Sequence, residues 1–409
     1  MLLSDNIKMA LASLRASRWR SVLTMLGIIV GVASVVTVVS IGEGVRQQIA
    51  GQINHLGSDL ITIRPGKLVN RSANGTITSV NVLTALGSSS LSEQDLDVIK
   101  ATTNVKLAVP FSRVSASVKV DDREFNDGFI VGTTDGAPEV LSQKVQFGAF
   151  FGPDDLSKHI VVIGPRVAQK FFQENVPVGK SLDIRGEHFV VGGIFEQFDT
   201  SPLTPNADYN DAIFVPYDSA KALLSGQTQI YQVLVKPNQT VQTDMVIANL
   251  THNLYEAHGQ QTDFTILKQA ESLTVANRIV TLLTSLIAGM ATISFVVGGI
   301  GIMNIMLVSV IERTREIGIR KAVGATNRQI LNQFVTEAAV ISFAGGIIGL
   351  LLSLLAIYFI DVFTPIQPTI TVPIMVVAMA VAIAIGMFFG IVPAVKAASK
   401  DPIDALRYE

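Results

Sequence analysis

Residues 279–311 of this chain read IVTLLTSLIAGMATISFVVGGIGIMNIMLVSVI, a stretch of 33 residues without a charged side chain, and residues 312–321 that follow read ERTREIGIRK. A helix needs about 20 apolar residues to cross the hydrocarbon core of a bilayer, which is roughly 30 Å thick. The long stretch therefore predicts a membrane-spanning helix. The charged run predicts a segment that lies at one membrane surface.

Three more charge-free stretches occur, at Ser21–Gly42, at Ala338–Ile360 and at about 372–395. A charge at the bilayer centre costs about 2.5–3.5 kcal/mol on insertion scales, so such windows are typical of membrane spans. The composition agrees, because 49% of the residues are hydrophobic, 16% are charged and the mean hydropathy is +0.45. We predict four spans, at residues 21–42, 280–310, 334–360 and 372–395. The first is expected to be a retained anchor, because its apolar core is too long for a secretory signal.

The basic residues predict the orientation, since Lys and Arg beside spans collect on the cytoplasmic side. Residues 1–20 carry four of them, 311–333 carry five, 396–409 carry three and the connection 361–371 carries none. Both termini and the segment 311–333 are therefore expected in the cytoplasm. The connection 361–371 and residues 43–279 are expected outside.

The outer segment 43–279 is long enough to fold around its own core. Its patterning predicts a mixed α/β domain between the first and second spans, with strands at 60–63, 115–120, 129–132, 160–163, 213–215 and 231–235 and helices at 165–172, 218–224 and 241–258. Residues 181–194 predict a hairpin that turns at Gly186. Residues 70–90, rich in Ser, Asn, Thr and Gly, predict a mobile loop.

The sequence lacks the residue spacings of known phosphate-binding and metal-binding sites. Gly179-Lys180-Ser181 resembles the end of a phosphate-binding loop, but the glycine that the motif needs five residues earlier is Glu174. The five histidines lack metal-ligand spacing, and the chain has no cysteine. We expect no catalytic, cofactor or metal residues, no enzyme activity of the chain alone and no nucleic-acid partner.

Glycines four residues apart occur in three of the predicted spans, and the second span is glycine-rich. Such spacing removes the side chains that keep two helices apart in lipid, so it predicts close helix packing and, with only four spans, contact with a second copy. The glycines concerned are Gly27, Gly31, Gly298, Gly301, Gly345, Gly349, Gly386 and Gly390.

The charged segment after the second span has two readings. Glu312, Arg315 and Glu316 are spaced for ion pairs on one helix face, Gly318 and Gly324 predict a bend, and Thr326 or Asn327 can cap a helix that enters the third span. The segment is either a positively charged loop that sets topology or an element that docks a partner. The residue pattern favours both readings equally.

Longer stretches resemble a known family. Residues 299–325, GIGIMNIMLVSVIERTREIGIRKAVGA, look like the signature of ABC-transporter permeases of the MacB type, the macrolide-exporter branch of the FtsX-like superfamily. Four shorter segments resemble the same family. They are LGIIVGVASV at residues 26–35, LGSDLITIRPG at 56–66, VVIG at 161–164 and PVGKSL at 177–182. The similarity extends over nearly the whole chain.

The resemblance implies an exporter permease that works as a dimer, bound to two cytoplasmic ABC ATPase subunits, and transmits their closure mechanically to the outer domains. The outer domain of the family has two lobes, with the inserted lobe expected at about 141–202. Residues 1–20 match an amphipathic helix on the cytoplasmic face, and 311–326 match the ATPase-coupling segment. The coupling residues are then Glu312, Arg313, Arg315, Glu316, Gly318, Arg320, Lys321, Gly324 and Ala325.

Macrolide exporters of this family carry their ATPase on the same chain, before the first span, where this sequence has about 20 residues. The resemblance therefore implies a separate ATPase subunit that binds ATP and Mg²⁺, and a membrane-fusion adaptor outside. Drugs, peptides and lipid-like molecules are the substrate classes of such permeases. Two alternatives stay open, a lipoprotein-extraction permease and a transmembrane regulator of a cell-wall hydrolase.

Overall fold

The structure is a computed structural model that describes residues 18–55, 59–72, 75–81, 84, 91–121, 123–125, 128–155, 158–198, 208–224, 229–238, 243–364 and 366–406. The chain divides into two compact units, one formed by Met1–Val45 with Val280–Glu409 and the other by Arg46–Ile279. Residues 1–17 of the helix that is expected at 1–20 lie outside the described residues.

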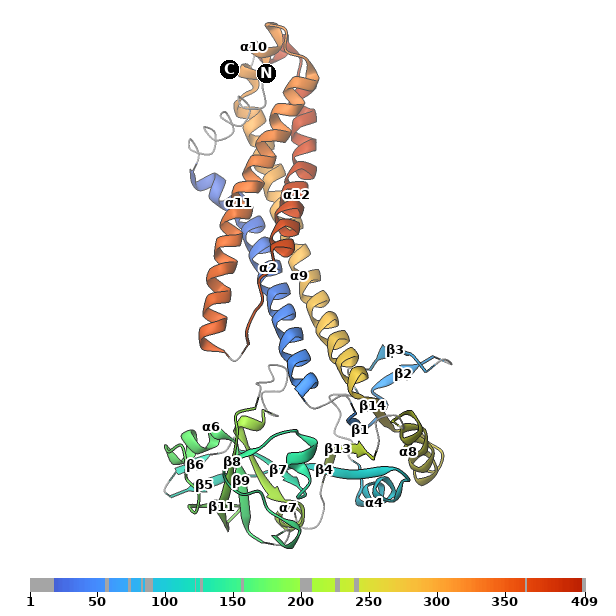
Figure 1. Cartoon of the computed structure of the whole chain (residues 1–409). Helices are drawn as coiled ribbons and strands as arrows, with labels where there is room; N and C mark the ends of the chain where they lie inside the picture. Colours follow the sequence, from blue (N-terminus) through green and yellow to red (C-terminus); the bar gives the residue numbers. More distant parts are fainter. Residues whose placement is uncertain are drawn as a thin grey trace. The chain divides into compact units, whose positions relative to one another are not determined.

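Four long helices dominate the first unit (Figure 1). They are α2 (Arg18–His55), α9 (Gln269–Glu312), α11 (Asn327–Phe363) and α12 (Val372–Ala398). Within the described residues, these four helices are long and apolar enough to cross a membrane. The four expected spans lie within them. Both α2 and α9 continue well past the spans, into the second unit of the chain.

The helices of the first unit approach closely where the sequence places glycines. An added Cβ on Gly298 of α9 would lie 2.7 Å from the carbonyl carbon of Gly27 on α2, so these backbones touch. One on Gly349 of α11 would lie 2.8 Å from Cβ of Val32. Such contacts replace side-chain bulk with backbone dispersion contacts, which drive helix association in lipid.

The other predicted glycines meet side chains of the same chain. Gly31 faces the ring of Phe295, Gly345 faces Ile28, and both Gly386 and Gly390 of α12 face α11. Gly301 is half-buried. These packing faces are used within one chain, so contact with a second copy needs a different face.

Two short helices accompany the four long ones. They are α10 (Thr314–Ala322), between α9 and α11, and α13 (Pro402–Leu406), after α12. At the other ends of the helices, the connection before α12 packs on α2: the Thr369 amide donates to the Ser40 carbonyl at 2.9 Å. A Cβ added to Gly44 would lie 2.8 Å from Cα of Pro368.

The second unit is built on one mixed sheet of twelve described strands in the order β14-β1-β13-β4-β7-β12-β9-β11-β10-β5-β6, with β8 paired to β11. The strands are β1 (Ile61–Pro65), β4 (Val105–Ser115), β5 (Val118–Val120), β6 (Arg123–Phe125), β7 (Phe129–Thr133), β8 (Val145–Gly148), β9 (Ile160–Ile163), β10 (Ser181–Ile184), β11 (Glu187–Phe195), β12 (Ala212–Pro216), β13 (Ile230–Pro237) and β14 (Phe264–Lys268). Its helices are α4 (Glu93–Ala101), α5 (Ala137–Val140), α6 (Pro165–Val167), α7 (Tyr217–Leu223) and α8 (Thr243–Ala257), with short η1 (Pro153–Asp155), η2 (Ala168–Phe172) and η4 (Tyr209–Asp211) turns.

The predicted α/β domain is confirmed. Five of the six expected strands match β1, β7, β9, β12 and β13, while the strand expected at 115–120 is interrupted, because β4 ends at Ser115 and β5 begins at Val118. The hairpin at 181–194 is also confirmed as β10 and β11. Arg185 and Gly186 at its turn have φ values of 53° and 84°, which suit a tight two-residue connection.

The expectation of a mobile loop is wrong for its first part. Strands β2 (Val69–Arg71) and β3 (Ile77–Val80) pair antiparallel and form a separate two-stranded sheet. We call Val69–Val80 the 69–80 hairpin. Its polar residues resemble a loop because most side chains of these two strands, Asn70, Arg71, Thr78 and Ser79, are exposed. Residues 73 and 74, between the two strands, and residues 82, 83 and 85–90 lie outside the described part of the chain.

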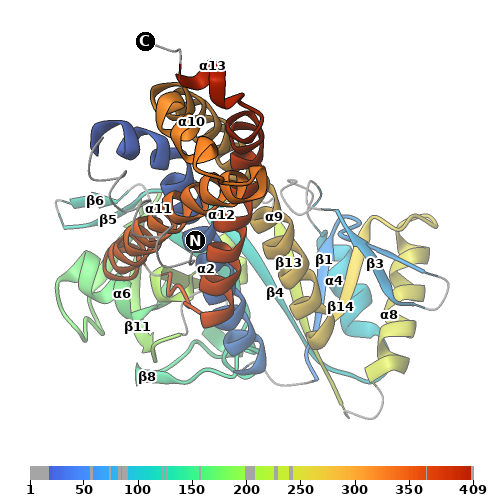
Figure 2. The ribbon, with the colours of Figure 1, turned by 90° about the horizontal axis from the view of Figure 1, so that it is seen from above.

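The two ends of the large sheet have separate hydrophobic clusters, in keeping with two lobes. Seen from above, β1, β13 and β14 lie with α4 and α8 on one side, and β5, β6, β11 and α6 lie on the other (Figure 2). Strands β5 and β6 precede the expected insert at 141–202 yet join its end of the sheet through β10. The boundary of the inserted lobe stays a prediction.

Candidate functional site

The charged segment after α9 folds as a separate short helix. The ladder of α9 ends at Glu312, Arg313 adopts φ −105° and ψ 18°, and α10 then runs over Thr314–Ala322. Thr314, Ile317 and Gly318 are buried, while Ile319 and Val323 are 49% and 85% exposed. A helix that buries one face and exposes large apolar side chains on another offers a surface for a partner.

The turn between α10 and α11 has the predicted chemistry. Gly324 has φ +106°, a value that residues with a Cβ rarely adopt. Thr326 then caps α11: its hydroxyl accepts from the Gln329 amide, and the Gln329 side chain accepts from the Thr326 amide at 2.9 Å. This reciprocal capping box confirms Thr326, rather than Asn327, as the cap.

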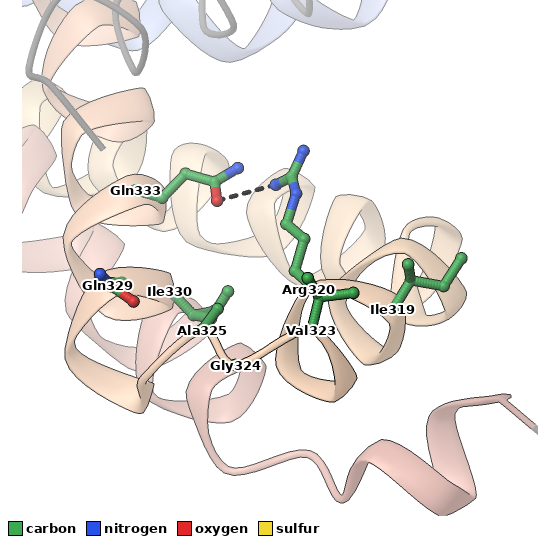
Figure 3. Close-up of a pocket in the computed structure, with 8 residues that line it drawn as sticks. All are labelled: Ile319, Arg320, Val323, Gly324, Ala325, Gln329, Ile330 and Gln333. Carbon is green, nitrogen blue, oxygen red and sulfur yellow. Dashed lines mark hydrogen bonds between the residues drawn. The ribbon is translucent and has the colours of Figure 1, made fainter.

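Two arginines hold α10 against α11. Arg313 Nη1 lies 3.3 Å from Oε1 of Glu337, whose side chain is only 7% exposed. Arg320 Nη1 donates to Oε1 of Gln333 at 2.8 Å (Figure 3) and also pairs with Glu316 one turn earlier. Because Glu337 and Gln333 are buried, these contacts satisfy polar groups that would be costly to leave unpaired.

Lys321 and Gly318 hold α10 against the end of the chain. The Lys321 ammonium donates to the carbonyls of Ala398 and Lys400 at 2.6 and 2.8 Å, where α12 ends and leaves carbonyls without helical partners. A Cβ added to Gly318 would lie 2.7 Å from Cβ of Ala405 on α13. The expected bend at Gly318 is therefore wrong: this glycine lies inside α10 and permits close packing, and the chain turns at Gly324.

A hollow of about 420 Å³ lies between α10 and the start of α11. Figure 3 shows its lining, which comes from both helices and the turn between them: Ile319, Arg320, Val323, Gly324, Ala325, Gln329, Ile330 and Gln333. Ala325, expected in the coupling set, lies in this wall. The lining is mostly apolar, and Val323 at its edge is almost fully exposed.

Apart from Gly324 and Ala325 in the turn after α10, the predicted coupling residues fall into two groups. Arg313, Gly318, Arg320 and Lys321 contact the chain's own helices, whereas Glu312, Arg315 and Glu316 are exposed residues. Glu312 and Arg315 were expected on one continuous helix, but they belong to α9 and α10, which are separated at Arg313. Glu316 forms an ion pair with Arg320, one turn later in α10.

Sequence reasoning missed the inner partners of α10. Glu337 lies just before the charge-free stretch Ala338–Ile360 and drew no prediction. Gln333 and the carbonyls at the end of α12 carried no signal either, because a tertiary contact determines their role. The exposed apolar pair Ile319 and Val323 could have been found, since the two residues are four apart in a charged helix.

The other chemical candidates behave as ordinary structure. Lys180, in the sequence that resembles a phosphate loop, pairs with Glu174 at 2.7 Å, and Ser181 after it begins strand β10. Across the described ranges, no three His, Cys, Asp or Glu side chains are grouped to hold a metal.

Comparison with known proteins identifies the family. The MacB-like periplasmic core domain matches residues 21–253, and the FtsX-like permease C-terminal domain matches residues 288–402. The chain is a membrane protein of the MacB-like, FtsX-like family of ABC-transporter permeases.

The similarity to curated relatives extends over the whole chain. "Macrolide export ATP-binding/permease protein MacB" of Marinobacter nauticus is 36% identical over 99% of this chain and 61% of its own length. "Pyoverdine export ATP-binding/permease protein PvdT" of Pseudomonas syringae is 33% identical over 100% of this chain and 60% of its own. The chain thus spans about three fifths of these relatives. "Uncharacterized ABC transporter permease YknZ" of Bacillus subtilis is 31% identical over 100% of both chains.

Among solved structures, the chain is similar to the periplasmic region of MacB from Actinobacillus actinomycetemcomitans, with 20% identity, a TM-score of 0.43, and coverage of 55% of this chain and 94% of that one. The extracellular domain of the transporter YknZ gives 18% identity and a TM-score of 0.39, over 51% of this chain and 100% of that one.

Proposed function

We propose that the chain is the permease subunit of an ATP-driven exporter, and that a separate cytoplasmic ABC ATPase docks on α10 and its neighbouring turn. The exposed apolar side chains of Ile319 and Val323, on a helix fastened to α11 and to the end of α12, carry this proposal. Alignment with a relative named as an ABC transporter permease over the full length of both chains supports the permease role.

The contacts of α10 explain how ATPase movement would enter the membrane unit. A force on Val323 would pass through Arg320 to Gln333 of α11 and through Lys321 to the end of α12. It would also pass to α9, which precedes α10 directly. α9 is one helix of 44 residues, about 66 Å long at 1.5 Å per residue, and its first residues belong to the outer unit. This continuity supports mechanical transmission across the membrane.

The distribution of basic residues supports the orientation in this proposal. The termini and α10 face the cytoplasm of a bacterial cell, and residues 43–279 face outward from the inner membrane. The functional unit is a homodimer with two ATPase subunits that bind ATP and Mg²⁺, together with a membrane-fusion adaptor. Relatives named for macrolide and pyoverdine export favour efflux of drug, peptide or lipid-like molecules.

Stimulation of the ATPase tests this proposal. The chain is purified in nanodiscs with its co-expressed ABC ATPase, and ATP turnover is measured as a function of permease concentration. Val323→Asp is expected to weaken docking by about 2 kcal/mol, or about 30-fold, as loss of an apolar contact at an interface centre does. Met245→Asp is the matched control, because Met245 is an exposed apolar residue of α8. Equal stimulation by Val323→Asp and wild type would contradict docking on α10.

A further inference from the structure

The 69–80 hairpin lies outside the twelve-stranded sheet but packs on the beginning of α9. Leu68 and Val69 form a hydrophobic cluster with Leu267 of β14 and Val275 of α9. Ile77, Val80 and Ile279 pack against the same cluster. The covered face of the hairpin is therefore the face toward α9, which explains why two strands suffice there.

Arg278 of α9 binds the backbone of β3. Its Nη1 donates to the Thr78 carbonyl at 2.6 Å and its Nη2 donates to the Ile77 carbonyl at 2.8 Å. A planar guanidinium can hold two successive acceptors in one orientation, which a single ammonium cannot do. The contact therefore fixes both the position and the rotation of α9 against the hairpin.

Arg71 of β2 makes a second contact, in the opposite direction. Its guanidinium binds both carboxylate oxygens of Glu271 in α9, at 2.5 and 3.0 Å, and the Ile266 carbonyl at 3.0 Å. Burial raises the pKa of Glu271, but the bonds from Arg71 and from the Lys268 amide outweigh it, so the pKa is lowered and the carboxylate stays ionised. Bidentate pairs of this kind are strong and directional.

The three α9 residues of this contact share one helix face. Glu271, Val275 and Arg278 follow one another at intervals of four and three residues. The base of the hairpin is joined to the large sheet as well, because the Leu68 amide donates to Oγ1 of Thr265 in β14 at 2.8 Å. The hairpin thus connects the first turns of α9 to the sheet by a route separate from the peptide link between β14 and α9.

We propose that the 69–80 hairpin makes the outer end of α9 rigid with the outer domain, and that Arg278 is its main positioning residue. A helix that is joined to a sheet only through one peptide link can pivot about that link. Movement of the helix would then not be passed on to the sheet. With the hairpin in place, displacement or rotation of α9 moves the sheet. This inference rests on the proposed function, in which α9 transmits motion from the ATPase.

The test measures the distance between α9 and the outer domain in the full chain. Because the sequence has no cysteine, spin labels can be placed at Gln94→Cys on α4 and Thr274→Cys on α9, both exposed. Pulsed electron resonance is recorded in nanodiscs with the co-expressed ABC ATPase, without nucleotide and with ATP and vanadate. Labelled chains are diluted with unlabelled ones, so that only the distance within one chain is recorded. The wild-type background should then give one narrow distribution that ATP leaves unchanged, because α9 and α4 move together.

Arg278→Met should broaden this distribution without nucleotide and make its maximum shift with ATP. Arg278→Lys, which keeps the charge but can hold one carbonyl at a time, should fall between. Arg123→Met is the matched control, because Arg123 also donates to a carbonyl, that of Phe171, at 3.1 Å elsewhere in the unit; it should behave as wild type.

A distribution in Arg278→Met as narrow as that of wild type, with and without ATP, would overturn the proposal. Broadening in Arg278→Met without any ATP-dependent shift would support the hairpin contact and contradict transmission along α9, so failure of the proposed function is distinguished from failure of this inference.

Discussion

The crossing of α2 and α9 at Gly27 and Gly298 predicts a specific cost for one methyl group. A Cβ at position 298 would lie 2.7 Å from the Gly27 carbonyl carbon and 2.8 Å from the Ile28 amide nitrogen. Ordinary van der Waals contact begins near 3.5 Å, and backbone atoms cannot rotate away as a side chain can. The two helices must separate for Gly298→Ala to be accommodated.

The same helix contains the control. Gly289 of α9 has no atom within 4 Å of an added Cβ. Both Gly298→Ala and Gly289→Ala gain the same helix propensity, about 1 kcal/mol in water, so this gain cancels in their comparison. Overpacking costs about 1–3 kcal/mol, and we expect Gly298→Ala to be less stable than Gly289→Ala by that amount.

The assay is reversible unfolding in mixed detergent micelles, with SDS as denaturant and far-ultraviolet circular dichroism as the signal. A difference of about 1.4 kcal/mol is a tenfold change in the unfolding equilibrium, so the expected range is well resolved. Equal midpoints for the two variants would refute the close crossing of α2 and α9.

Three further predictions concern other parts of the chain. His258 lies between Asp95 and Asp263, with Nε2 at 2.9 Å and Nδ1 at 2.5 Å from their carboxylates; burial lowers the pKa of His258, but these bonds outweigh it and raise the pKa. The stabilisation is thus complete below the unfolded pKa of about 6.5 and is lost as pH rises through the folded value. Thermal midpoints should fall over that range, His258→Gln should remove the dependence, and His252→Gln should keep it. Gly324→Val should cost about 1–3 kcal/mol through its positive φ and abolish ATPase stimulation, whereas stimulation at the wild-type level would contradict a role for this turn. In intact cells, a membrane-impermeant maleimide should label Gln367→Cys and spare Thr326→Cys; the reverse pattern would invert the orientation.

The helices of the membrane unit could be predicted because their signal is local and strong. A window without charges has few uses outside lipid, and Thr326 followed by Gln329 is a complete capping box in four residues. Similarly, the turn at Gly324 depends on one backbone angle that glycine adopts at no steric cost.

Strand β4 shows where local patterns failed. Its sequence VKLAVPFSRVS contains Pro110, and proline inside a run indicates an edge strand or a loop. Pro110 lies opposite Val233 of β13, in the part of β4 that β7 does not pair, because the β7 register begins at Ser112. Burial of Phe111 and Val109 on β4 stabilises it there, a tertiary effect that no window of sequence contains.

The coupling role of the candidate site stays a prediction, and the contacts of its cations within the chain could not be predicted. Arg313, Arg320 and Lys321 were expected to meet the ATPase, yet their contacts are with Glu337, Gln333 and backbone carbonyls of the chain itself. Helical spacing within α10 could not determine this, because α10 has neighbours from both α11 and α13. Long cationic side chains at a membrane surface satisfy topology and tertiary contact equally well.

Photocrosslinking tests docking of the ATPase on α10 most directly. A photoreactive phenylalanine is placed at Val323, 85% exposed beside the hollow, or at Phe363, 75% exposed at the far end of α11. Irradiation of membranes that contain the co-expressed ABC ATPase should give a permease–ATPase adduct from position 323 and none from position 363. An adduct from position 363 without one from 323 would contradict ATPase docking on α10.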